Sequence, residues 1–262
     1  MESAREKKER GSSPTAPPGQ RRLPGLSVRD GFVRHPFDLE FGVRTSGLIA
    51  GRHLGSGHQH DRYATAYYAI APSVFREMIS RWRRLAPPAP FTDYTFVDMG
   101  AGMGRAMLLA SEFPFHAVHG IELNAMLARI AARNLTVWRK SGRARSPMRI
   151  FAGEAADLDP LPGPCLLFLF NPFGAPVLRR VLSRWSRAFS ERSGQLDLLY
   201  VNNEQEHVFA AFPGFRRLFA GRVRRSRADD LADRRILTSQ PEGEYAAIPW
   251  EDCSIYRWTG MV

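Results

Sequence analysis

The sequence predicts an α/β fold, built on a largely parallel sheet with helices on both faces. Between residues 95 and 201, short apolar runs alternate with segments whose apolar residues recur at helical spacing. The run Cys165–Phe170 is apolar throughout, as expected of a strand that is buried on both faces. Strands that alternate with helices in this way are joined by crossovers, which makes neighbouring strands parallel.

The elements are expected in a regular order along the chain. The first strand ends at Met99, a helix follows from about Gly104 to Phe113, and Pro114 ends that helix. Asn124 is placed to cap the next helix, and another helix follows the fourth strand. The expected strands cover residues 95–99, 117–122, 148–152, 165–170 and 196–201, part of the Arg-rich stretch 215–235, and 253–258. The Arg-rich stretch is also expected to contain a mobile insertion.

The chain before the first strand has a different character. Residues 1–25 are rich in Lys, Arg, Ser, Pro and Gly, a composition typical of a disordered basic tail. The polar, Gly-rich stretch that follows gives no clear pattern as far as residue 61, and then an amphipathic helix is expected from Ser73 to Leu85, with Ser73 as its N-cap. We therefore expect a tail at 1–25, a cap segment with its helix at 26–90, and a main domain at 91–262.

The most informative motif lies where the first strand ends. Asp98 is followed by glycines at every second position, Gly100, Gly102 and Gly104, and the second strand ends in Glu122. Glycine lets the backbone approach a ligand closely because it has no Cβ. An acid at the end of the second strand is placed to accept hydrogen bonds from a ribose. The dinucleotide fingerprint G-x-G-x-x-G fails, because its third glycine position is Arg105, and no G-x-x-x-x-G-K-[ST] phosphate loop is present.

The remaining pattern, D-x-G-x-G-x-G, resembles the first motif of class I S-adenosylmethionine-dependent methyltransferases, roughly from Phe91 to Phe173. The resemblance implies a Rossmann-like, seven-stranded, mostly parallel sheet with helices on both faces and an antiparallel C-terminal edge hairpin. It also implies that 91–262 is the methyltransferase domain, with S-adenosylmethionine as cofactor. The implied cofactor-binding residues are Asp98, Gly100, Ala101, Gly102, Gly104, Glu122, Leu123, Glu154, Ala155 and Asn171.

The resemblance also suggests what the acidic residues do. Asp98 would orient the glycine turn or the methionine ammonium group, or alternatively cap the backbone amides of the turn. Glu122 would accept from the ribose diol. The stretch after the third strand resembles the family's third motif, in which an acid accepts from the adenine amino group. Glu154 is at the matching position and Asp157 is a second candidate; the alternative is an ordinary polar loop.

The fourth strand ends in Asn171-Pro172-Phe173, which resembles the [N/D]-P-P-[Y/F] motif of amine and amide methyltransferases. In that motif the side-chain oxygen and a backbone carbonyl hold the acceptor nitrogen, and an aromatic ring packs near the transferring methyl group. Here the aromatic residue comes one position early and Gly174 follows it. The resemblance makes these three residues the candidate catalytic group, and the alternative is an Asn-Pro turn that starts a helix.

Two features upstream of the first strand concern the same site. His53, His58, His60 and Asp61 form a loose cluster that has the residue types of a zinc site. No helix or strand fixes their spacing, so we favour a polar loop and expect no metal. The second feature is an aromatic stretch that contains Tyr63, Thr65 and Tyr67. These three are candidate lid residues over the cofactor; the alternative is local packing of surface aromatics.

Composition limits the cellular setting and the partners. The formal charge is +11, but nearly all of the basic residues are Arg, with Lys only at positions 7, 8 and 140. Such a bias is typical of a GC-rich genome, so we favour a solvated surface over a nucleic-acid site. The chain has two cysteines and no C-x-x-C motif, which indicates a reducing, cytoplasmic setting. No apolar run has the length of a membrane helix, and the N-terminal stretch lacks the apolar core of a secretory signal.

The sequence therefore predicts a cytoplasmic S-adenosylmethionine-dependent methyltransferase whose acceptor is a nitrogen on a protein side chain or a small molecule. The runner-up is an RNA methyltransferase, motivated by the charge and by the Arg-rich stretch 215–235. A third hypothesis is a non-catalytic module that binds the cofactor or a nucleic acid. Some Rossmann-type lysine methyltransferases, including the nucleosomal enzymes and their bacterial look-alikes, share this layout, which does not identify the substrate.

Overall fold

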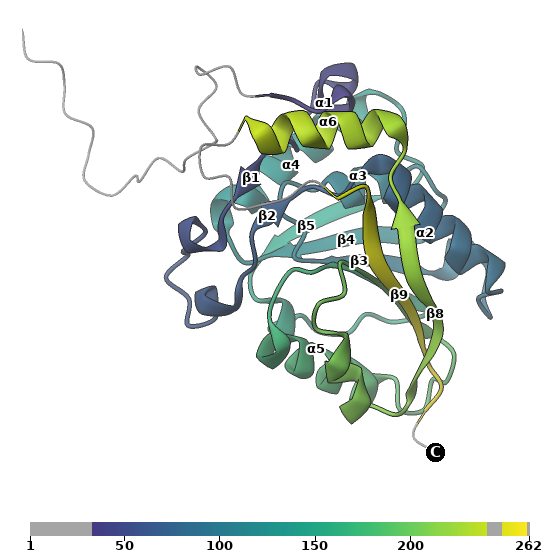
Figure 1. The fold of residues 1–262 in the computed structure, drawn as a ribbon. Coiled ribbons are helices and arrows are strands. Elements are labelled where there is room, and N and C mark those ends of the chain that lie inside the picture. The colour runs from purple at the N-terminus through teal and green to yellow at the C-terminus, as the bar shows by residue number, and fades with distance from the viewer. Residues whose placement is uncertain (1–32, 240–247, 261–262) are drawn as a thin grey trace, which may run out of the picture.

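The computed structural model describes residues 33–239 and 248–260, so the expected tail at 1–25 lies outside the described residues. Seven strands form one sheet in the order β5-β4-β3-β6-β7-β9-β8 (Figure 1). The strands are β3 Thr95–Met99, β4 Ala117–Glu122, β5 Met148–Ala152, β6 Cys165–Phe170, β7 Leu196–Val201, β8 Phe215–Arg224 and β9 Trp250–Trp258. The first five of these pair in parallel, and β9 runs antiparallel to both β7 and β8. The predicted fold class, including the antiparallel C-terminal hairpin, is confirmed.

Helices cover both faces of the sheet. The main helices are α2 Pro72–Arg84, α3 Arg105–Ala110, α4 Ala125–Lys140 and α5 Ala175–Ala188. Apolar residues of the first three pack together against one face, and those of α5 pack against the other. The smaller elements of the described ranges are α1 Pro36–Phe41, α6 Arg227–Thr238, a two-stranded sheet of β1 Leu48–Ile49 and β2 Tyr67–Tyr68, and five short 3₁₀ turns. Within the described ranges, no helix has both the length and the apolar character needed to cross a lipid bilayer.

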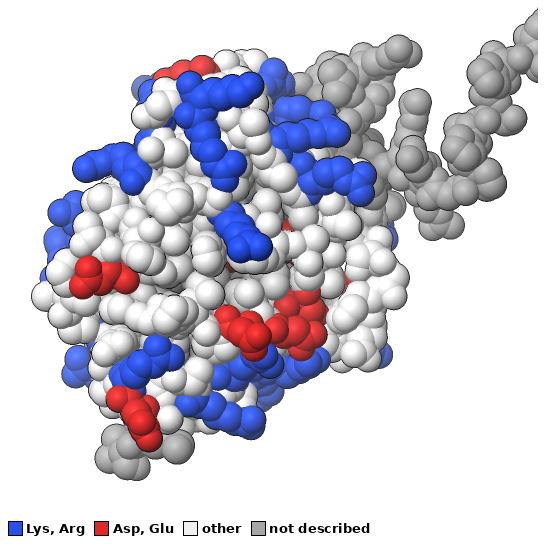
Figure 2. Space-filling view, turned by 180° about the vertical axis from the view of Figure 1, so that it is seen from behind, with Lys and Arg blue, Asp and Glu red and all other residues white. Residues whose placement is uncertain are grey.

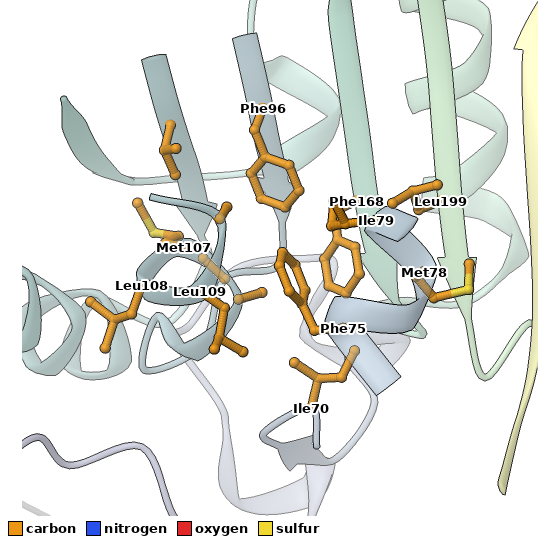
Figure 3. Packing of buried hydrophobic residues seen from close by; sticks show 14 of the residues in the cluster. Ile70, Phe75, Met78, Ile79, Phe96, Met107, Leu108, Leu109, Phe168 and Leu199 are labelled. Carbon is orange, nitrogen blue, oxygen red and sulfur yellow. The ribbon is translucent and has the colours of Figure 1, made fainter. Parts of the chain in front are cut away.

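The alternation of side chains along the central strands divides the core between the two faces. In β3, Phe96 belongs to the cluster on the α2 side, whereas Val97 and Met99 belong to the cluster on the α5 side. Phe75 of α2 packs against both Phe96 and Phe168, with ring centroids 5.8 and 5.5 Å away (Figure 3). These aromatic contacts fix α2 on the sheet directly beside the strands that carry the site.

Helix α4 begins as the sequence predicts. The Asn124 side chain accepts hydrogen bonds from the backbone N–H groups of Met126 and Leu127, at 3.0 and 3.2 Å. The N-cap prediction for α2 is wrong: α2 starts at Pro72 after Ala71, and Ser73 lies inside the first turn. The Ser73 N–H donates instead to Asp229 of α6, at 2.8 Å. A partner so distant in sequence takes the place of a local cap, which a sequence pattern does not reveal.

The stretch 215–235 also differs from its prediction. β8 takes up its first part, and the residues expected to form a mobile insertion form helix α6 instead. Asp233 of α6 is buried and pairs with Arg225 at 3.3 Å, and Arg225 also pairs with Glu251 of β9. Because a buried charge needs a partner, these ion pairs anchor α6 to the hairpin.

Candidate active site

The arrangement of the sheet determines where a ligand fits. β3 lies next to β4 on one side and next to β6 on the other, so the crossovers from these strands run in opposite directions. Ligands of such sheets bind at the carboxyl ends of the strands, at this switch point. A cavity of about 930 Å³, counted with its opening to solvent, lies there and is lined by the ends of β3, β4, β5 and β6 and by residues 64–70.

The cavity brings together most of the sequence-predicted site residues. The lining includes Asp98, Gly100, Ala101, Gly102, Glu122, Leu123, Glu154, Ala155, Pro172 and Phe173, together with Thr65, Tyr67 and His60. Gly104 is not part of the lining; it precedes α3 as its N-cap residue, with a φ of 88°. Asn171, Tyr63 and Asp157 are also outside the lining, although each neighbours a residue that belongs to it or contacts one.

The glycine turn is shaped by close approaches from two other segments. Gly100 and Gly102 have φ values of 85° and 54°, a region that favours glycine. A Cβ on Gly100 would lie 2.4 Å from the Pro172 Cβ, and a Cβ on Gly102 would lie 2.3 Å from the Tyr67 ring. These two glycines therefore let the turn contact both the Asn-Pro-Phe motif and the segment before α2.

Glu122 is tied into the turn that it faces. One carboxylate oxygen accepts from the Gly102 N–H at 2.7 Å, and the other accepts from the Asn124 N–H at 2.8 Å. Burial raises the pKa of Glu122, and these two backbone hydrogen bonds lower it in part. A carboxylate has about four acceptor positions, so each oxygen retains the capacity to accept from a ligand.

Asp98 lies beside Glu122 but has no comparable partners. Its side chain is only 3% exposed, and no hydrogen bond reaches its carboxylate from any residue in the described part of the chain. Burial, followed by the charge of Glu122, raises the pKa of Asp98 well above its ordinary value. The amides of Gly100 and Ala101 donate to the Ile121 carbonyl, both at 2.9 Å, so capping of these amides is not a role of Asp98.

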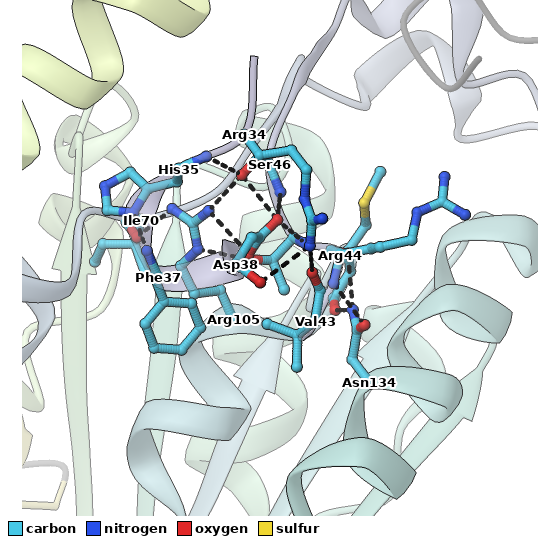
Figure 4. Close-up of polar contacts among 12 residues, drawn as sticks. Arg34, His35, Phe37, Asp38, Val43, Arg44, Ser46, Ile70, Arg105 and Asn134 are labelled. Carbon is cyan, nitrogen blue, oxygen red and sulfur yellow. Dashed lines mark hydrogen bonds and ion pairs between the residues drawn. The ribbon is translucent and has the colours of Figure 1, made fainter. Parts of the chain in front are cut away.

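Arg105, at the position where the dinucleotide fingerprint has glycine, is buried and anchors the N-terminal segment (Figure 4). Its guanidinium donates to the Thr45 hydroxyl at 2.7 Å and lies 3.7 Å from the Asp38 carboxylate. Asp38 also accepts from the backbone N–H groups of Thr45 and Ser46, at 2.6 and 2.7 Å. The sequence pattern did not reveal this role; the available signal was a charged residue at the start of an otherwise apolar helix.

The segment before α2 pairs with the Asn-Pro-Phe motif. The Thr65 hydroxyl donates to the Asn171 carbonyl, and the Thr65 N–H donates to the Pro172 carbonyl at 3.4 Å. The Gly174 N–H donates to the Tyr63 carbonyl at 2.9 Å, and Ala64 and Phe173 form an antiparallel bridge. Residues 63–65 therefore form a wall that is hydrogen-bonded to the end of β6.

Asn171 has an unusual backbone and an unusual side chain. Its φ is 40°, a left-handed conformation that Asn tolerates better than most residues. The side chain is 7% exposed, and its Oδ1 atom is buried without a hydrogen-bond partner. A buried carbonyl oxygen that lacks a partner is costly, which makes it a candidate contact for a ligand.

Glu154 meets two of the upstream histidines. Its Oε2 atom lies 2.6 Å from the His60 Nδ1 and 3.7 Å from the His58 Nδ1, while its Oε1 accepts from the Ala156 N–H at 3.1 Å. The far side of the His60 ring contacts Arg180 of α5 at 3.1 Å. The sequence did not indicate this convergence, because the histidines and Glu154 are about 94 positions apart.

Part of the positive charge on the surface has acidic neighbours. On the face in Figure 2, Lys and Arg side chains gather in the upper part of the view and again near the bottom, and some of them lie beside Asp or Glu. Within the Arg-rich stretch, several arginines have acidic partners: Arg217 pairs with Glu206, and Arg222 pairs with Asp252. These pairs and the buried Arg225 reduce the unpaired charge on which the RNA hypothesis was based.

No protein-family model matches the chain, and no curated protein matches it either. Among solved structures, it is similar to a candidate RNA methyltransferase from Pyrococcus horikoshii (13% identity, 71% of this chain, 83% of that chain, TM-score 0.47). It is also similar to the ribosomal protein L11 methylase of Lactobacillus delbrueckii subsp. bulgaricus (13% identity, 71% of this chain, 77% of that chain, TM-score 0.41). A third similar structure is the magnesium protoporphyrin IX methyltransferase of Synechocystis with bound S-adenosylmethionine (11% identity, 71% of this chain, 79% of that chain, TM-score 0.45). Similarity this remote carries no inference about activity, which has to come from the residues of the site.

Proposed function

We propose that the protein is an S-adenosylmethionine-dependent methyltransferase that acts on a nitrogen of a protein side chain or a small molecule. The observation that carries the proposal is the pair of buried carboxylates, Asp98 and Glu122, on either side of the glycine turn at the switch point. Buried carboxylates need cations or hydrogen-bond donors. S-adenosylmethionine offers an ammonium group, a sulfonium group and a ribose diol.

The residues of the cavity fit this cofactor better than a dinucleotide. The Asp98 carboxylate has no hydrogen-bond partner among the described residues, and Glu122 keeps unused acceptor positions after its two backbone bonds. Two neighbouring acids would repel a pyrophosphate, and the only buried guanidinium of the lining, that of Arg105, already contacts Asp38 and Thr45. Asp98 would therefore hold the ammonium group and Glu122 the ribose, with Glu154 near the adenine.

The cofactor, when bound, supplies an activated methyl group with a neutral leaving group. The task of the protein is then to hold the acceptor in line and to exclude water. Both main-chain carbonyls of Asn171 and Pro172 are already bonded to Thr65, which leaves the Asn171 Oδ1 as the unpaired acceptor of the motif. We assign Asn171 to orientation of the acceptor nitrogen, and Pro172 and the largely buried Phe173 to the wall of the methyl channel.

Two further expectations belong to this proposal. Tyr67 and Thr65, which line the cavity, act with the described part of the cap segment 26–90 as a fixed cover over the glycine turn. A cytoplasmic setting is supported by the two cysteines, Cys165 and Cys253, which are buried free thiols.

Calorimetry with purified protein tests the cofactor assignment. We expect saturable binding of S-adenosylmethionine and S-adenosylhomocysteine, and no comparable binding of NAD. Tight NAD binding, or no binding of any of the three ligands, would overturn the assignment. The acceptor can then be sought by mass spectrometry of a cell extract incubated with isotopically labelled cofactor.

A further inference from the structure

We propose that His58, His60 and Glu154 form a zinc site on the wall of the cavity. Among the residues described in the structure, they are the one group of His, Cys, Asp or Glu side chains whose potential ligand atoms all lie within 4.8 Å of one another. We call them the His-His-Glu cluster. Two of its members, His60 and Glu154, also line the cavity. Two imidazoles and one carboxylate form a ligand set that zinc accepts, with a fourth position left open.

The distances in the cluster are close to those that zinc requires. Tetrahedral coordination with bonds of about 2.1 Å places neighbouring ligand atoms about 3.4 Å apart. The Glu154 Oε2 lies 3.7 Å from the His58 Nδ1 and 2.6 Å from the His60 Nδ1. One pair therefore has to approach by a few tenths of an ångström and the other has to separate by somewhat less than 1 Å. The third pair, formed by the two histidines, lies within the 4.8 Å that spans the cluster.

The surrounding structure supplies the framework that the sequence did not reveal. Asp61 accepts hydrogen bonds from the backbone N–H groups of Ser56, Gly57 and His58, at 2.7, 2.8 and 3.1 Å, which fixes the loop that carries His58. The Ala156 N–H holds the Glu154 Oε1, which leaves Oε2 as the single ligand oxygen. Outer contacts of this kind orient the ligands of metal sites.

The positions of the protons in the cluster determine what must change when zinc binds. The backbone N–H of His60 donates to the His58 Nδ1 at 3.2 Å, so this nitrogen carries a lone pair, and zinc binding there would replace that hydrogen bond. The His60 Nε2 faces an N–H of Arg180 at 3.1 Å, so the His60 proton is on Nδ1, toward Glu154. Zinc bound at the His60 Nδ1 transfers that proton to Nε2, where it would face the Arg180 donor. Because two N–H donors cannot hydrogen-bond each other, the Arg180 side chain must then turn away. We therefore expect Arg180 to weaken zinc binding.

Titration of untagged protein with Zn²⁺ in competition with a chromophoric chelator tests the site. We expect one equivalent to bind, with an affinity that falls more than about 100-fold in His58→Ala and in Glu154→Gln, beyond the effect of an outer-sphere contact. Arg180→Gln should bind about tenfold more tightly, because glutamine can accept from the His60 Nε2–H. His116→Ala and His207→Ala remove exposed histidines outside the cluster and should leave the affinity unchanged.

The outcomes separate this proposal from the cofactor assignment. If wild type binds Zn²⁺ no more tightly than His58→Ala, or if Arg180→Gln binds it more weakly, the zinc site is wrong. Circular dichroism of each variant establishes that it is folded, and the partly exposed His58 is the variant least disruptive to packing. Because His58 is outside the cavity lining, His58→Ala should keep its affinity for S-adenosylmethionine while losing zinc. Absence of cofactor binding in wild type would leave the zinc result intact.

Discussion

On the β4 side of the cavity the buried carboxylate already has hydrogen-bond partners, whereas the side formed by the ends of β3 and β6 contains polar groups without partners. On the β4 side, both Glu122 oxygens accept backbone N–H groups. On the other side, the Asp98 carboxylate and the Asn171 Oδ1 are buried and unpaired among the described residues. The difference suggests that Glu122 belongs to the folded turn before any ligand arrives, while Asp98 and Asn171 are stabilised only when a ligand supplies donors.

Glu122→Ala should have the largest effect, because it removes both a structural and a binding group. Charge-assisted hydrogen bonds to the ribose contribute roughly 1.5–3 kcal/mol, so cofactor affinity should fall about ten- to a hundredfold. The buried amides of Gly102 and Asn124 would also lose their acceptor, at a cost of roughly 1–3 kcal/mol each in unfolding free energy. Calorimetry and denaturant unfolding measure the two losses. Glu191→Ala, which removes an exposed glutamate, is the control.

A stable Glu122→Ala variant with weak cofactor binding would show that Glu122 serves the ligand alone. Full cofactor affinity would place the ribose elsewhere. Either result would contradict the proposed difference between the two sides of the cavity, in which Glu122 both stabilises the turn and binds the ligand.

Asn171→Gly should affect transfer and leave binding nearly intact. Glycine keeps the left-handed backbone at φ 40° and removes only the side chain. Single-turnover methyl transfer should fall at least about tenfold, as expected for loss of a positioning group, while cofactor affinity changes little. Asn202 follows β7 with a φ of 49°, so Asn202→Gly is a matched control for the backbone. Full transfer activity in Asn171→Gly would reduce the motif to a helix-starting turn and remove the support for a nitrogen acceptor.

Asp98→Asn should give the smallest effect, and one whose sign depends on the pH. The pKa of Asp98 is raised in the fold, so the carboxyl group favours folding when protonated and loses that contribution as the pH rises through its folded pKa. Without ligand, Asp98→Asn should therefore raise the melting temperature at neutral pH by a few degrees, since about 1 kcal/mol corresponds to roughly 2–4 °C at this size. The gain should shrink as the pH falls toward the ordinary carboxyl range near about 4.

With cofactor, the order should reverse. The ionised carboxylate attracts the ammonium group, so wild type should gain more thermal stability from S-adenosylmethionine than Asp98→Asn does. Wild-type affinity should fall as the pH falls through the raised pKa values of Asp98 and Glu122. A variant that is less stable than wild type without ligand at neutral pH would contradict the idea that Asp98 awaits a ligand.

The sequence predicted the five parallel strands well because apolar runs are local patterns. The bounds of the five parallel strands follow from apolar runs, and Glu122 follows from its place at a strand end. The contacts that the sequence could not predict join residues far apart in the chain. Ser73 receives its hydrogen-bond partner from Asp229, and His60 meets Glu154. Such pairs leave no periodic signal, since they depend on how finished elements pack.

The buried pairing of Arg105 with Asp38 has a consequence for how far the chain can be shortened. The residues that neutralise and hydrogen-bond the Arg105 guanidinium lie about 60 positions upstream of it. A chain that started at residue 91 would contain every strand of the main sheet, but it would lack the partners of Arg105 and the segment that covers this side chain, together with helix α2. Loss of this covering segment would expose the apolar side chains that pack against α2, which is unfavourable. The smallest autonomous unit therefore begins before Asp38, well upstream of the glycine motif.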